Sequence, residues 1–193
     1  DKDKPIGIYI GVWTPDWAKG QEIRTYAAIT DVLNWKCDRV YQSFNQHVAY
    51  LNNRASSEKL LDRPSYFSDV TYEMAMQARI LELQPGQRTG RMIPPYEILR
   101  GQKHPGEKVT HDNNMYALRH TGDFAKASNG GHDSRFVTEV GSGYMHWYVS
   151  SSEGRNEQTN VCGTNFKDGE GEWTHKANLG WSLRPFVAEL PQP

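Results

Sequence analysis

The chain has 193 residues, of which 37% are apolar, a mean hydropathy of -0.76 and a formal net charge of -1. No run approaches the roughly 18–20 apolar residues of a membrane-spanning helix. Lysine and arginine are scattered, which argues against a nucleic-acid surface because phosphate binding needs clustered positive charge. The length predicts one domain, residues 1–193, with residues 190–193 as a frayed tail.

The first half of the sequence predicts one strand followed by helices. Alternating apolar residues predict a strand in residues 5–13. Apolar spacings of three and four predict an amphipathic helix in residues 21–35, and residues 54–61 are a short helix candidate. A further helix is predicted in residues 72–83, because Ser68 and its neighbours can cap its start and a Pro-Gly pair ends it.

The second half predicts mainly strands, in residues 92–99, 114–119, 135–140, 144–150 and within 173–190. The two prolines inside the first of these place it at a sheet edge or a bulge. The polar segment between residues 154 and 171 is predicted to be irregular. We therefore expect an α+β fold, with helices mainly in the N-terminal half packed on an antiparallel-rich β-sheet.

Two cysteines, Cys37 and Cys162, have no metal-ligand spacing. They fit either one disulfide or two unrelated buried thiols. The chain begins at Asp1, which fits a secreted protein after signal-peptide removal or a trimmed chain. We expect a secreted protein.

The order of elements between Ser68 and Trp147 carries a resemblance to a known family. A serine precedes a helix, a predicted strand ends in Arg100, the run Asp112–Tyr116 follows, and a later predicted strand bears Glu139. This order resembles that of the catalytic subunits of ADP-ribosylating toxins of the pertussis and cholera-like group. The chain departs from the family in its first strand, where the family has an arginine.

The resemblance implies an ADP-ribosyltransferase that uses NAD as substrate to modify a host protein acceptor, with possible delivery subunits as partners. It implies that Glu139 is the catalytic carboxylate and that Ser68 supports it. Arg24 is the nearest substitute for the missing arginine, and Tyr66 or Tyr72 would stack on nicotinamide. A Cys37–Cys162 disulfide is also typical of the pertussis-type members.

Two alternatives come from the residues themselves. The first is a non-enzymatic secreted binding module or adhesin, which would recognise a glycan or a host surface through aromatic residues. Its candidate surface is one face of the strand at residues 144–150. The second is a histidine-dependent hydrolase or nuclease, which would use some of five histidines. Their irregular spacing predicts no metal site. These are His104, His111, His120, His132 and His146.

Overall fold

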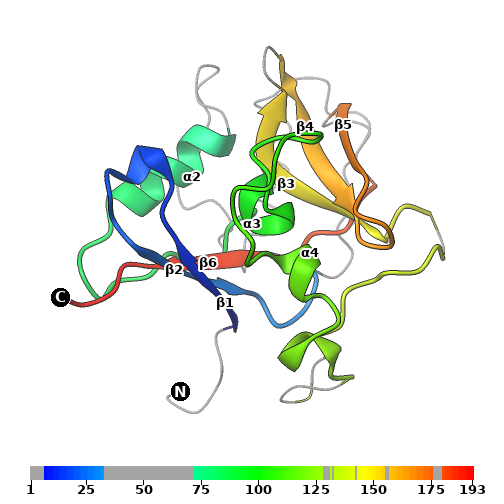
Figure 1. Ribbon diagram of the computed structural model, residues 1–193, viewed down its shortest axis with the longest axis horizontal. Coiled ribbons are helices and arrows are strands. Elements are labelled where there is room, and N and C mark those ends of the chain that lie inside the picture. The colour runs from blue at the N-terminus through cyan, green and yellow to red at the C-terminus, as the bar shows by residue number, and fades with distance from the viewer. Residues whose placement is uncertain are drawn as a thin grey trace.

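The computed structural model describes residues 7–32, 72–127, 131, 133–141, 143–154, 157–175 and 180–193. In this part of the chain, two three-stranded antiparallel sheets lie on either side of short helices, as Figure 1 shows. No helix among the described residues has the length and apolarity needed to cross a membrane.

The first sheet has the strand order β1-β2-β6, formed by Ile8–Trp13, Ile23–Ala27 and Phe186–Glu189. The strand predicted near the N-terminus is therefore confirmed. β1 and β2 form an antiparallel hairpin, and β6 returns from the far end of the chain to pair with β2. The ladder is irregular near Gly11, where Asn113 lies so close that a Cβ atom would touch its side chain.

The helix predicted for residues 21–35 is wrong. Ile23, Thr25 and Ala27 are buried, whereas Arg24 between them is exposed, which is the period of two of a half-buried strand. The apolar spacings of three and four were equally compatible with a strand over so short a stretch. Pairing with both β1 and β6 decides between them, because it satisfies the backbone groups of β2 on both edges.

The helix predicted for residues 72–83 is confirmed as α2, Tyr72–Leu81. The strands predicted at residues 92–99 and 114–119 are wrong, because helices α3, Tyr96–Arg100, and α4, Met115–Leu118, lie there. Proline fits at the start of a helix, where its missing N–H is not needed, so the prolines before α3 begin it. The side chain of Asn114 accepts a hydrogen bond from the Ala117 amide and caps α4.

The second sheet is a meander of β3, Trp147–Gly154, β4, Glu157–Asn165, and β5, Gly171–His175. The predicted strand at residues 144–150 is thus confirmed in part, and the strands expected between residues 173 and 190 are found. The irregular segment expected between residues 154 and 171 is wrong, since β4 fills most of it. Residues 135–140 form no strand, so Glu139 lies in a connecting segment.

The coarse fold class is confirmed, because antiparallel sheets and a few helices make up the described chain. The predicted concentration of helices in the N-terminal half is not confirmed. α3, α4 and the 3-10 helix η2, Gly122–Ala125, lie in or at the edge of the second half, whereas η1, Asp16–Ala18, is a single turn. The helix predicted for residues 54–61 lies outside the described residues.

One apolar core joins the two sheets through the helices. It includes Ile10 and Ile23 of the first sheet, Met76 of α2, Leu99 of α3 and Tyr148 of the second sheet. α2 and α3 both pack against β3. Residues from the end of β1, from the start of both helices and from β3 meet at one place on the surface.

A buried arginine ties the two sheets together near the start of β6. Arg184 is fully buried, and its Nε lies 2.7 Å from Asp31 Oδ1. Its other nitrogens donate to the backbone oxygens of Ala28, Ser134 and Arg135. The Tyr148 hydroxyl of β3 donates to the second Asp31 oxygen at 2.7 Å. The buried charge is therefore paired and its donors are used, as a buried guanidinium requires.

Candidate functional site

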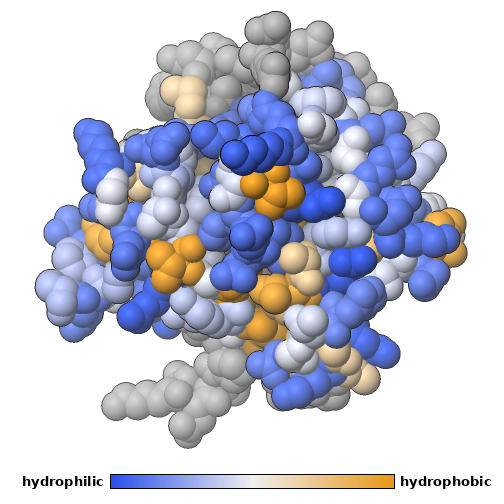
Figure 2. All heavy atoms as spheres, in the orientation of Figure 1, coloured by the Kyte–Doolittle hydropathy of each residue, from blue (hydrophilic) through white to orange (hydrophobic). Residues whose placement is uncertain are grey.

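A cavity of about 410 Å³ lies where the end of β1, η1, the first turns of α2, the start of α3 and the loop after α3 meet. Figure 2 shows that the molecular face in that view is mostly hydrophilic, with apolar residues in small separate patches. The cavity wall combines aromatic, acidic and imidazole side chains. Its principal members are Trp13, Trp17, Asp16, Glu73, Glu97, Lys103, His104, Thr110, His111 and Ser152.

Two tryptophans form the aromatic part of the wall. β1 ends at Trp13, and Pro15 then turns the chain into η1, which carries Trp17. The two rings pack edge to face, with centroids 5.4 Å apart. Trp13 is buried, whereas Trp17 is only partly buried against the core. Both tryptophans line the cavity, and Trp17 is the more accessible of the two.

Glu97, in the first turn of α3, is the most firmly held carboxylate of the wall. Its Oε1 accepts a hydrogen bond from the indole Nε1 of Trp13, and its Oε2 accepts one from the Thr110 hydroxyl at 2.8 Å. Each carboxylate oxygen can accept more than one hydrogen bond. Glu97 is therefore oriented by the protein and still able to accept hydrogen bonds from a ligand.

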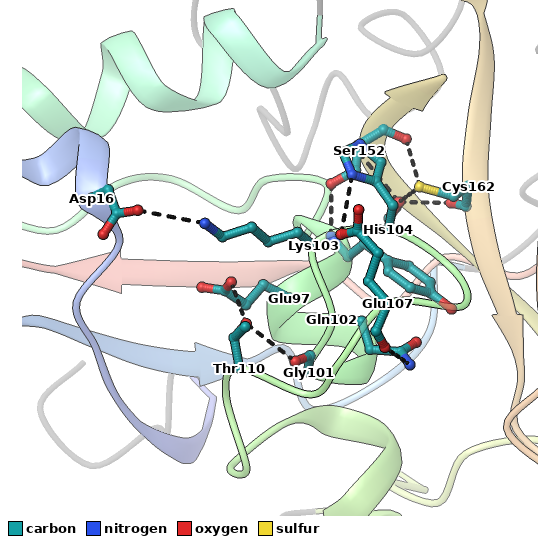
Figure 3. Close-up of polar contacts among 12 residues, drawn as sticks. Asp16, Glu97, Gly101, Gln102, Lys103, His104, Glu107, Thr110, Ser152 and Cys162 are labelled. Carbon is teal, nitrogen blue, oxygen red and sulfur yellow. Dashed lines mark hydrogen bonds and ion pairs between the residues drawn. The ribbon is translucent and has the colours of Figure 1, made fainter. Parts of the chain in front are cut away.

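The loop after α3 supplies the basic side of the wall. It folds back as a hairpin with a bridge between Gln102 and Val109. This turn requires glycine at position 101. Gly101 adopts φ 89°, which other residues rarely do, and a Cβ atom there would clash with the backbone oxygen of His111. Figure 3 shows Lys103 extending from this loop toward Asp16, whose Oδ2 lies 3.4 Å from its Nζ.

Two histidines of this loop line the cavity. The Nδ1 of His104 lies 3.6 Å from Glu107 Oε2, beyond ordinary hydrogen-bond distance. The Nε2 of His111 is buried and has no hydrogen-bond partner in the part of the chain that the structure describes. Burial lowers the pKa of His111, while Glu97 and Asp112 act in the opposite direction. His111 is therefore held toward its neutral form.

The opposite wall comes from α2 and β3. Burial raises the pKa of Glu73, and the nearby carboxyl group of Glu153 raises it further, while His104 lowers it. Glu73 is therefore held toward its protonated form, in which it can donate as well as accept. Ser152 closes this wall, and its Oγ accepts a hydrogen bond from the Tyr96 amide at 2.9 Å, which joins β3 to α3.

Two of the predicted transferase residues, Glu139 and Arg24, are described by the structure and lie away from this cavity. Glu139 is exposed in the segment before β3. Arg24 lies on β2 and faces Glu189, with 3.7 Å between the charged atoms. Neither lines the cavity. Ser68 and Tyr66 lie outside the described residues, and Tyr72 begins α2 one residue before Glu73.

The aromatic surface expected on residues 144–150 is wrong in its position. Trp147 is buried and stacks on Trp181, with centroids 5.3 Å apart. Tyr148 and His146 on the other face of the strand are buried too, so β3 is covered on both sides. Tyr144 is exposed but precedes the strand. The accessible aromatic wall belongs to Trp17 instead.

The histidines that the sequence analysis singled out do not lie together in the structure. His104 and His111 share the cavity, whereas His120 is exposed and His146 is buried immediately before β3. His132 lies outside the described residues. Among the described residues, no three or more histidine, cysteine, aspartate or glutamate side chains gather as metal ligands do.

Cys162 is buried on β4 and is not bonded to another cysteine among the described residues. Its sulfur donates to the backbone oxygen of Ser152 at 3.0 Å, and the Ser150 hydroxyl lies 3.6 Å from it. Figure 3 shows the contact between Cys162 and Ser152. Cys37 lies outside the described residues, so the disulfide stays a prediction.

Sequence reasoning found the two histidines of the cavity but missed Glu97, Glu73 and the pairing of the two tryptophans. The Trp13-x-x-x-Trp17 spacing across a proline turn is visible in the sequence, but nothing local connects it to Glu97. No family model, curated protein or solved structure matches this chain.

Proposed function

We propose that the protein is a carbohydrate-binding module, which acts outside the cell and takes a saccharide into the cavity beside Trp17. The observation that carries this proposal is one cavity with an aromatic ring on one wall and oriented polar groups on the others. Sugars need both, because their C–H faces pack on aromatic rings while their hydroxyls require hydrogen bonds.

The polar groups suit hydroxyl ligands in kind and in position. Glu97 accepts hydrogen bonds and is already oriented by Trp13 and Thr110. The hydroxyl of Thr110 lines the same cavity and adds a second polar group beside this carboxylate. Oriented polar groups of this kind favour ligands that carry hydroxyl groups over purely apolar ones.

The test is calorimetric titration of the full chain with a panel of soluble oligosaccharides. The matched variants are Trp17→Ala and Trp173→Ala, since Trp173 is an exposed tryptophan of β5 that does not line the cavity. We expect at least one saccharide to bind, with affinity reduced about tenfold or more by Trp17→Ala and unchanged by Trp173→Ala. Absence of binding across the panel, or equal effects of the two variants, would overturn the proposal.

A second candidate, a histidine-dependent hydrolase, is favoured by one specific observation. His104 and His111 line the same cavity as Glu97 and Glu73, which provides imidazole and carboxyl groups for general acid–base chemistry. The test is release of nitrophenol from a phosphodiester substrate by the full chain and by His111→Ala. Release that the variant loses would support this candidate, and no release by either would retire it.

A further inference from the structure

The cavity wall carries more acidic than basic side chains. Among its described lining residues, the carboxylates of Asp16 and Glu97 stand against one lysine, Lys103, while Glu73 is held toward its neutral, protonated form. Lys103 is directed toward Asp16, with its Nζ 3.4 Å from the Asp16 Oδ2. The positive charge of Lys103 is therefore paired with Asp16 rather than with Glu97. This pair is exposed to solvent and is worth little energetically, but it leaves the carboxylate of Glu97 as the uncompensated charge.

Glu97 is held by neutral donors. The indole of Trp13 and the hydroxyl of Thr110 orient the two carboxylate oxygens without cancelling their charge. No lysine or arginine pairs with Glu97 in the part of the chain that the structure describes. A carboxylate fixed in this way at a cavity attracts a cation more strongly than a mobile surface carboxylate does, because little side-chain freedom is lost on binding.

The aromatic wall acts in the same direction. An ammonium group within about 6 Å of an indole ring is attracted by the negative face of the ring. Trp17 is partly buried and held edge to face against Trp13, and it lines the same cavity as Glu97, to which Trp13 donates a hydrogen bond. A carboxylate and an indole wall together form the combination that recognises organic cations.

We propose that the ligand is an aminated saccharide, such as a glucosamine oligomer, whose protonated amine lies between Glu97 and Trp17. This inference rests on the proposed carbohydrate-binding function. The ammonium group donates to Glu97, and the ring hydroxyls contact the other polar groups of the wall, Thr110 among them. An N-acetylated sugar loses the cation, and a sugar acid adds a negative charge that the wall repels.

The experiment is calorimetric titration of the full chain at about pH 6, where sugar amines are protonated. The ligands are a glucosamine tetramer, the same tetramer after N-acetylation, and a cellulose-derived tetramer without nitrogen. We expect the glucosamine tetramer to bind about tenfold more tightly than either of the others, with the preference falling as salt is raised. Glu97→Gln should abolish the preference, whereas Glu172→Gln, an exposed carboxylate of β5, should preserve it.

The outcomes separate the two proposals. Equal binding of the three tetramers, or tighter binding of the acetylated one, would overturn the amine inference while leaving carbohydrate binding in place. No binding of any tetramer, after the wider panel has also failed, would overturn both. Glu97→Gln also removes part of a structural contact, so Asp16→Asn is a second variant. Asp16 is exposed, so Asp16→Asn should not unfold the protein. The substitution leaves the positive charge of Lys103 unpaired at the cavity, and this charge should repel the sugar amine and weaken the preference.

Discussion

The indole nitrogen of Trp13 donates a hydrogen bond to a carboxylate oxygen of Glu97, 84 positions later in the sequence. This contact joins the end of β1 to the first turn of α3. It also fixes the carboxylate at the cavity, so the same bond serves the fold and the site.

Replacing Trp13 with phenylalanine should lower the free energy of unfolding by about 2–4 kcal/mol. The change removes a hydrogen bond to a charged group and leaves space behind Trp17. Urea denaturation followed by circular dichroism measures this difference. The control is Trp173→Phe, an exposed position that should change little. Equal stability of the two variants would contradict a role for the Trp13–Glu97 bond.

Replacing Arg184 with methionine should cost about 3–5 kcal/mol of stability, because Asp31 would lose its partner in a largely buried setting. The same denaturation measurement applies. Arg135→Met is the matched control, since Arg135 is exposed and pairs with Asp133 at the surface. If the two substitutions had similar effects, the buried pair would not be holding the sheets together.

Long, strongly patterned segments of this fold were predictable, and short ones were not. β1 and α2 follow from alternation and from helical spacing with a clear end. The Ile23–Ala27 segment has too few residues to separate a period of two from a period of 3.6, and its pairing with β6 involves the far end of the chain. The prolines before α3 fit a sheet edge or a helix start equally well, and tertiary packing decides between them.

Some residues of the site were predictable from the sequence, but their arrangement was not. His104 and His111 stand out in the sequence because their loop is polar and rich in histidine. Glu97 does not stand out, because its function depends on Trp13 and Thr110, which reach it from separate segments. Glu139 stood out by its order in the chain, but order alone does not place a carboxylate in a cavity.

The thiol of Cys162 should be almost unreactive in the folded protein. Burial raises its pKa to about 12, so very little reactive thiolate is present near neutral pH. Labelling of a Cys37→Ser variant with a thiol reagent at about pH 8 should be about a hundredfold slower, or more, than after denaturation. Equal rates would contradict the burial. If the unsubstituted protein shows no thiol even when denatured, the predicted Cys37–Cys162 disulfide forms.

The transferase prediction has its own measurement, which is nicotinamide release from NAD by the full chain and by Glu139→Gln. If the prediction holds, release should fall by about two orders of magnitude or more in the variant, while its unfolding curve stays that of the unsubstituted protein because Glu139 is exposed. The control is Glu172→Gln, another exposed carboxylate. No release by the unsubstituted protein, and no thermal shift on adding NAD, would retire this function.

The stability of the protein should depend on pH through Glu73. Burial and the neighbouring Glu153 raise the pKa of Glu73, so the folded protein keeps this proton at pH values where the unfolded chain has lost it. Stability from this group is therefore fully present below the ordinary glutamate pKa and declines as pH rises through the raised folded value. Glu73→Gln cannot ionise, so it should gain stability relative to the unsubstituted protein between about pH 4 and pH 7. Urea denaturation at several pH values measures this difference, with Glu172→Gln as the exposed control. A difference that stays constant across the pH range would show that Glu73 is not destabilised in its ionised form.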